Sequence, residues 1–206
     1  MPGILRGFLV ALILIMGGNL RAQNETDQRP IVCFGDSYTE GSGSPRDQSY
    51  PSRLARELKL PVINAGITGQ TAGEALRRVD RDVSVHNPRL VIVEFGTNEA
   101  YRGYPVEAAL RNLEVIVGKL REKNIPVILV GVHFGNFQEN FDAGLRDLST
   151  RYKTDLVLNV LEGILDDPAL KSDAYHPNGE GYGLMFKRIL PEVRKALKRE
   201  GEKAAA

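Results

Sequence analysis

Five short runs of almost purely apolar, often β-branched residues alternate along this chain with longer stretches of helical period. Runs of this kind are typical of strands covered on both faces, as in a parallel sheet. They occupy residues 31–34, 62–63, 90–95, 127–130 and 156–160. The pattern therefore predicts an α/β fold with right-handed crossovers, in which helices cover both faces of an open, doubly wound sheet of five parallel strands.

The stretches between the predicted strands have the spacing of amphipathic helices. Thr71 and Glu74 have the spacing of a capping box, which indicates a helix start after the second strand. Pro191 is expected to kink or restart the last helix. The predicted helices cover residues 50–58, a segment after Thr71, and residues 106–120, 137–152 and 179–189.

The N-terminus has the residue order of a secretory signal peptide. Arg6 precedes an unbroken apolar run over residues 8–16, and Ala22 stands before a polar segment as the expected cleavage point. The run is shorter than the roughly 20 residues of a membrane span, so a retained anchor is the weaker alternative, and a buried helix is weaker still. We therefore expect an exported protein, periplasmic or extracellular, with no stable membrane insertion after cleavage.

The domain organisation follows from these boundaries. A length of 206 residues favours one compact domain, and no internal repeat or linker interrupts the chain. The expected segments are a signal peptide over 1–22, a polar segment over 23–29, a single folded domain over 30–198 and a disordered tail over 199–206.

Charge and cysteine content exclude several classes of function. Lys and Arg total 27 against 26 for Asp and Glu, so nothing in the charge balance favours binding to nucleic acid. Cys33 is the only cysteine, which excludes an intrachain disulfide and a CxxC site. The three histidines, His86, His133 and His176, are dispersed without the spacing of metal ligands.

Polar residues able to perform nucleophilic catalysis follow the predicted strands, where sites form in doubly wound sheets. Ser37 follows the first strand, between glycines that permit a tight turn. Asp173 and His176 lie three residues apart before the last helix, a spacing that lets one turn bring the carboxylate near Nδ1. A serine hydroxyl needs such an imidazole as its base, and the imidazole needs a carboxylate that fixes its orientation. Together these residues predict a Ser-His-Asp triad, although each alone is also an ordinary turn or surface residue.

Acyl transfer also needs hydrogen-bond donors for an oxyanion. Gly66 follows the second strand and can present its backbone N–H, while Asn98 follows the third strand and can present its side-chain amide. The Ser37 N–H is a third candidate. A plain turn glycine and an asparagine that only holds its loop remain the alternatives.

Four blocks in order resemble the SGNH (GDSL) hydrolases, most closely the bacterial thioesterase I, arylesterase and lysophospholipase branch. The blocks are residues 34–41, 64–66, 96–99 and 173–178, and the similarity extends from about residue 31 to 190. The resemblance implies a flavodoxin-like three-layer fold with strand order 2-1-3-4-5. It implies Ser37 as nucleophile, His176 as general base and then acid, and Asp173 as its partner. It also implies an oxyanion hole made by Ser37, Gly66 and Asn98, and no metal or organic cofactor.

Departures from the family pattern concern the substrate. Glu99 stands where relatives of that branch usually have Asp, and two tyrosines follow it, so we expect a carboxylate and aromatic rings at the mouth of the site. We expect short acyl chains to be preferred for that reason. The candidate substrate contacts are Tyr38, Glu99, Tyr101, Tyr104, Phe134 and Phe137.

The sequence thus favours a serine esterase for small acyl or aryl esters, with no obligate protein partner implied. An O-deacetylase of exported polysaccharide or peptidoglycan would use the same triad. A noncatalytic flavodoxin-like module is the alternative from another class.

Overall fold

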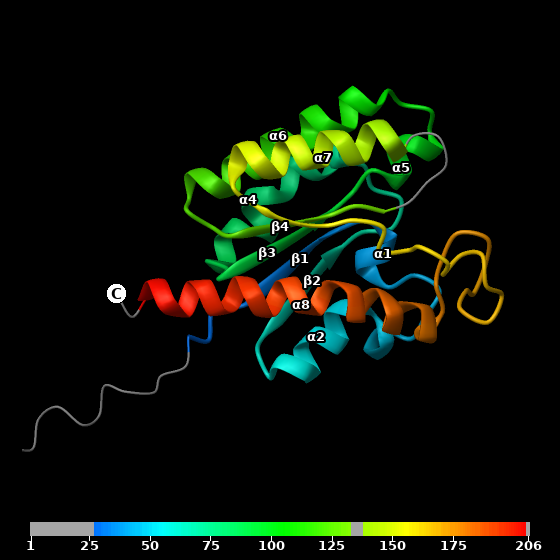
Figure 1. Ribbon diagram of the computed structural model, residues 1–206, viewed down its shortest axis with the longest axis horizontal. Helices are drawn as coiled ribbons and strands as arrows, with labels where there is room; N and C mark the ends of the chain where they lie inside the picture. Colours follow the sequence, from blue (N-terminus) through cyan, green and yellow to red (C-terminus); the bar gives the residue numbers. More distant parts are fainter. Residues whose placement is uncertain (1–26, 133–137, 205–206) are drawn as a thin grey trace, which may run out of the picture.

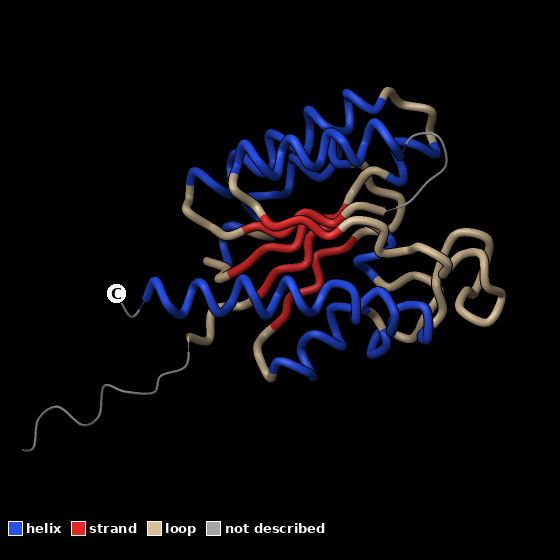
Figure 2. The backbone as a smooth tube through the Cα atoms, in the orientation of Figure 1, coloured by secondary structure: helices blue, strands red, loops and turns tan. Residues whose placement is uncertain are grey.

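The computed structural model describes residues 27–132 and 138–204. Five parallel strands form one sheet in the order β2-β1-β3-β4-β5, as the sequence and its family resemblance predict. The strands are β1 (Ile31–Gly35), β2 (Val62–Gly66), β3 (Leu90–Glu94), β4 (Val127–Val130) and β5 (Asp155–Val157). Figure 2 shows them as the middle of three layers, with helices on both faces.

Helices fill the connections between the strands, together with short 3₁₀ turns at Arg46–Gln48, Leu76–Arg78 and Ser84–His86. The helices are α1 (Ser37–Glu40), α2 (Tyr50–Leu58), α3 (Ala72–Ala75), α4 (Val79–Asp82), α5 (Thr97–Tyr101), α6 (Val106–Glu122), α7 (Gln138–Tyr152) and α8 (Gly179–Ala204). Thr71 and Glu74 form the predicted capping box at the start of α3. In Figure 1, α6 and α7 cover one face of the sheet while α2 and α8 cover the other.

Each central strand divides its side chains between two cores. Val32 and Phe34 of β1 pack with α3, α4, α6 and α7, whereas Ile31 and Cys33 pack with α2 and α8. Every residue of β1 and β3 is buried, which explains why both strands are almost entirely apolar in sequence. Cys33 is a wholly buried core residue, and burial raises the pKa of its thiol to about 12.

The last strand and the last helix differ from the sequence-based expectation. β5 ends at Val157, three residues early, because the chain turns at Asn159 with a φ of 55°. α8 continues as one helix through Pro191 to Ala204, so residues 199–204 are helical where a tail was expected. Ile189, Val193 and Ala196 continue its buried stripe past Pro191 and hold both halves on the sheet.

The strand order fixes where the site lies. From β1 the chain passes to β2 on one side of the sheet, whereas β3 lies on its other side. Loops after β1 and β3 therefore diverge at their carboxyl ends and leave a crevice between them. Gly35 makes the close approach at this edge, where it pairs with Gly66 on one side and Glu94 on the other.

We predict opposite effects of alanine at two glycines. In Gly35→Ala the new methyl group would overlap Thr39 Oγ1 and lie 2.7 Å from the carbonyl oxygen of Glu94, so the free energy of unfolding should fall by about 1–3 kcal/mol. In Gly118→Ala, within α6, the nearest atom is Tyr152 Cε1 at 3.8 Å, so better helix propensity should raise it by up to about 1 kcal/mol. Chemical denaturation measures both. Equal stability of the two variants would contradict this description of the β1 edge.

Candidate active site

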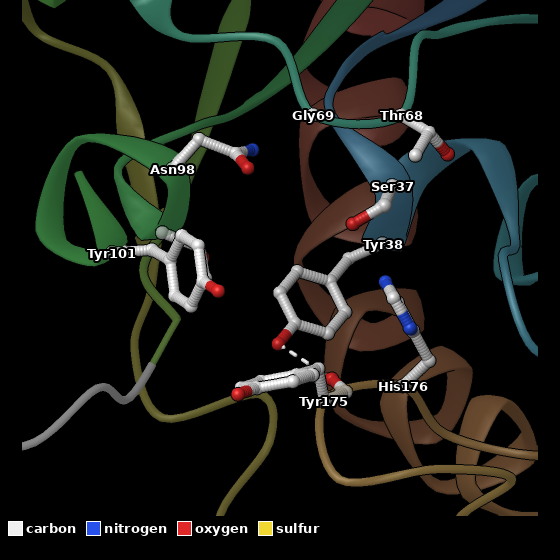
Figure 3. Close-up of a pocket in the computed structure, with 9 residues that line it drawn as sticks. Ser37, Tyr38, Thr68, Gly69, Asn98, Tyr101, Tyr175 and His176 are labelled. Carbon is white, nitrogen blue, oxygen red and sulfur yellow. Dashed lines mark hydrogen bonds between the residues drawn. The ribbon is translucent and has the colours of Figure 1, made fainter.

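A cavity of about 190 Å³ opens at the crevice predicted from the strand order. Its lining comes from four separate parts of the chain: the segments after β1, β2 and β3, and the loop before α8 (Figure 3). The lining residues are Ser37, Tyr38, Thr68, Gly69, Thr97, Asn98, Tyr101, Tyr175 and His176.

Ser37 lies at the start of the short helix α1 and is only 7% exposed. Asp36 caps this helix, because its Oδ1 accepts a hydrogen bond of 3.0 Å from the Tyr38 N–H. Gly41 ends the helix in the left-handed conformation with a φ of 97°. As the first helical residue, Ser37 has a backbone N–H without an intrahelical acceptor, so this donor is available at the nucleophile itself.

The loop before α8 orients His176 through a single carboxylate. Asp173 Oδ1 accepts the backbone N–H groups of Tyr175 at 2.7 Å and His176 at 2.8 Å, and Oδ2 lies 2.9 Å from His176 Nδ1. The Tyr175 N–H and then the His176 ring hold the pKa of Asp173 below its usual range. The carboxylate is therefore ionised where it can fix the imidazole tautomer, and the other ring nitrogen remains free to act.

Ser37 and His176 both line the cavity, and in Figure 3 the imidazole ring points toward the serine. Within the described residues no hydrogen bond joins the Ser37 hydroxyl to that ring. Such contacts are often long without substrate and tighten when it binds.

Tyr38 ties the serine helix to the histidine loop. Its side chain is 1% exposed, and its hydroxyl donates a hydrogen bond of 2.8 Å to the Tyr175 carbonyl oxygen, drawn dashed in Figure 3. Its ring lies 6.0 Å from the His176 ring between centroids. Burial raises the pKa of Tyr38, so the hydroxyl stays protonated and remains a donor. Tyr38 was expected to contact substrate, and it lines the cavity while also bracing the loop.

Two of the three predicted oxyanion donors already have partners inside the protein. The Asn98 amide donates to Asp36 Oδ2 at 2.9 Å and to the Gln70 carbonyl oxygen at 3.1 Å. The Gly66 N–H donates to Asn64 Oδ1 at 3.0 Å. Only Asn98 of these two lines the cavity, so a bound oxyanion would have to compete with Asp36 or Gln70 for its amide.

Glu99 does not stand at the mouth of the site, contrary to the sequence-based expectation. It is 1% exposed, and its Oε1 accepts a hydrogen bond of 2.6 Å from the Ala72 N–H. The extra methylene of Glu relative to Asp lets the carboxylate reach the start of α3, and burial raises its pKa. Glu99 therefore stabilises the start of α3 and does not line the cavity.

Aromatic side chains form one side of the cavity, but they are only partly those predicted. Tyr101 lines it and packs edge to face on Tyr175, with ring centroids 5.7 Å apart and planes at 79°. Tyr104 is 47% exposed and is not part of the lining. Phe134 and Phe137 lie outside the described residues. Tyr175 was missed, although its place beside His176 in the sequence was a usable signal.

Two absences hold for the part of the chain that the structure describes. Residues 27–132 and 138–204 contain no group of three or more His, Cys, Asp and Glu side chains that could hold a metal ion. Over the same residues, no helix is both long and apolar enough to span a membrane.

Comparison with known proteins agrees with this geometry. Residues 33–184 match the GDSL-like lipase/acylhydrolase family. An arylesterase of Vibrio mimicus is 26% identical over 197 residues, covering 90% of this chain and 98% of that protein. Thioesterase 1/protease 1/lysophospholipase L1 of Escherichia coli K12 is 26% identical over 175 residues, covering 79% of this chain and 84% of that protein. The crystal structure of AlinE4, an SGNH-hydrolase family esterase, is 32% identical, with a TM-score of 0.67 over 84% of this chain and 99% of that one.

We predict that Tyr38→Phe lowers the melting temperature by roughly 2–4 °C, because an internal hydrogen bond contributes about 1 kcal/mol net. Tyr152→Phe is the matched control, since its hydroxyl makes a similarly part-buried bond, to Glu114, away from the cavity. Differential scanning calorimetry compares the two variants. A Tyr38→Phe protein that melts with the wild type would show that the hydroxyl does not brace the loop.

Proposed function

The chain belongs to the GDSL-like lipase/acylhydrolase family and is a serine hydrolase of carboxylic esters, and we propose that it works through an acyl-enzyme on Ser37. The observation that carries the proposal is the convergence of Ser37 and His176 on one cavity, with His176 Nδ1 held by Asp173. The esterase relatives do not favour the glycan deacetylase or the noncatalytic module.

In the proposed reaction His176 Nε2 takes the Ser37 hydroxyl proton as Oγ forms a bond to the ester carbonyl carbon. The ionised Asp173 stabilises the resulting imidazolium. The tetrahedral intermediate expels the alcohol, which takes the proton from His176, and leaves the acyl group on Ser37. Water then attacks the acyl-enzyme with His176 again as base, and the acid leaves as Ser37 recovers its proton.

The oxyanion is stabilised by three donors in this proposal: the Ser37 N–H, the Gly66 N–H and the Asn98 amide. Ser37 is the simplest of the three, because its N–H lies at the start of α1. The Gly66 N–H and the Asn98 amide each leave an acceptor within the protein and donate to the oxyanion as it forms. Such an exchange favours the charged transition state over the neutral carbonyl, since a charge-assisted hydrogen bond is the stronger one.

The cavity size points to a small substrate. Ligand pockets for drug-sized molecules span roughly 300–1,000 Å³, whereas this cavity measures about 190 Å³. The Tyr101–Tyr175 corner offers an aromatic edge and face to an apolar or aryl group. We propose short-chain acyl or aryl esters as substrates on this ground.

Residues 1–22 serve as an export signal in this proposal, with residues 30–198 as one hydrolase domain in an exported protein. The order of Arg6, the apolar run and Ala22 supports this assignment. Residues 1–22 themselves lie outside the described part of the chain.

We predict that an organophosphonate labels Ser37 and abolishes ester hydrolysis, because only an activated hydroxyl reacts readily with it. Peptide mass analysis locates the label. Ser37→Ala should lose both labelling and turnover, while Ser44→Ala in the following loop should keep both. Labelling of another residue, or undiminished turnover in Ser37→Ala, rules out the proposed nucleophile.

We also predict that Tyr101→Ala raises the ratio of kcat/KM for a ten-carbon ester to that for a butyryl ester by roughly 10-fold. Removing the ring enlarges the cavity where a longer chain gains apolar contact, at about 0.8 kcal/mol per buried CH₂. Tyr104→Ala is the matched control, because Tyr104 follows in the same segment without lining the cavity. A ratio that changes equally in both variants would show that Tyr101 does not limit chain length.

A further inference from the structure

Two carboxyl groups lie buried together directly behind the cavity. Asp36 follows β1 and Glu94 ends the neighbouring strand β3, and both residues are 0% exposed. The pairing of Gly35 with Glu94 brings them to the same point of the sheet edge. The Asp36 N–H donates to Glu94 Oε2 at 3.4 Å, and two ionised carboxylates could offer each other no hydrogen bond, because both are acceptors.

Their other contacts lead to the reacting groups. Asp36 accepts the Tyr38 N–H with Oδ1 and the Asn98 amide with Oδ2, at 3.0 and 2.9 Å. Glu94 Oε2 accepts the Thr39 hydroxyl at 2.9 Å and the Asp36 N–H at 3.4 Å. Asp36 thus holds the nucleophile helix and a predicted oxyanion donor at once, and Glu94 holds Asp36.

No cation in the described residues compensates this pair. The buried Arg78 donates instead to the carbonyl oxygens of Gly35 and Ala65 and lies over the Phe34 ring. Glu94 Oε1 has no hydrogen-bond partner among those residues. The other titratable groups that face the pair are carboxyl, phenol or thiol groups, namely Glu99 from α5, Tyr38 from α1, Tyr50 from α2, Tyr182 from α8 and, beside Tyr50, Cys33 of β1.

We propose that Glu94 is a positioning residue whose buried carboxyl group keeps its proton beside Asp36 and so limits the negative charge behind the oxyanion hole. The reason is electrostatic and rests on the proposed function. A second negative charge at this buried site would oppose the oxyanion and strengthen the hold of Asp36 on the Asn98 amide. With Glu94 protonated, the pair has at most one charge rather than two.

The direction of both pKa shifts agrees with a carboxyl group that stays protonated in this pair. Burial is the chief cause that raises the pKa of both groups, and the charge of Glu94 raises that of Asp36 further. The pKa of Glu94 rises from 4.5 to about 7. Between these values the folded protein keeps a proton that the unfolded chain has released, so stability must fall as pH rises through this window. The raised pKa of Asp36 acts in the same direction.

The test compares the melting temperatures of wild type and Glu94→Gln between about pH 4.5 and 8. Glutamine keeps a hydrogen-bond donor toward Asp36 but cannot ionise. Across the window the wild type should lose roughly 5 °C relative to Glu94→Gln, and the difference should be constant above it. Glu114→Gln is the control, because Glu114 pairs with Arg151 on the surface and should leave the wild-type pH dependence intact.

Asp36→Asn provides a second variant, and it should keep a fall in melting temperature through the Glu94 titration, because burial is the chief cause that raises the pKa of Glu94. Parallel pH dependence in wild type and Glu94→Gln would overturn the proposal. A protein that folds but hydrolyses no ester would contradict the proposed function and leave this comparison intact.

The pH dependence of kcat provides an independent test. The kcat of the wild type on a short aryl ester should fall roughly tenfold between about pH 7 and 9, as the pair gains its second charge. Glu94→Gln should lack this alkaline loss while its kcat at neutral pH stays within about threefold of wild type. A wild-type kcat that is flat over this range, or an equal alkaline loss in Glu94→Gln, would also overturn the proposal.

Discussion

Asp36 is the residue on which the site depends, because its buried carboxyl group joins two parts of the chain. Through Oδ1 it caps the helix that begins with Ser37, and through Oδ2 it holds the Asn98 amide after β3. Its position follows from the pairing of β1 with both β2 and β3, which forces the two chain segments to diverge at this edge. A buried polar group is tolerated only when its hydrogen bonds are made, so this arrangement has few alternatives.

The histidine side of the site is built differently, as a local turn rather than a junction between strands. Asp173 forms this turn by accepting two backbone N–H groups and then holds His176 Nδ1. The turn is joined to the serine side by Tyr38, whose hydroxyl reaches the Tyr175 carbonyl across 137 residues of sequence. Tyr38 thus connects the helix that carries the nucleophile with the turn that carries the base.

The sequence predicted the fold well because burial on both faces leaves a simple signal. The runs containing Val32 and Val91 could hardly be anything but central strands. Features set by tertiary contacts were harder to predict. Pro191 interrupts a helical pattern in sequence, yet the stripe through Ile189 and Val193 keeps the helix continuous against the sheet.

The site residues, too, could be predicted where their arrangement is local and not where it depends on tertiary contacts. The spacing of Asp173 and His176 is a local property, so it could be read directly from the sequence. Glu94 was missed because it looks like the polar end of an apolar strand, and only the three-dimensional pairing places it against Asp36. Glu99 was placed at the mouth because a sequence does not show that the Ala72 N–H lies within its reach.

The most direct test of the account is a crystal structure of the protein with a phosphonate bound covalently to Ser37, since its tetrahedral phosphorus imitates the intermediate of ester hydrolysis. A phosphoryl oxygen is expected about 2.7–3.1 Å from the Ser37 N–H, the Gly66 N–H and the Asn98 amide. The amide should then have given up one of its present acceptors, Asp36 or Gln70. An adduct whose oxygens point away from all three donors, with His176 turned from Ser37, would contradict it.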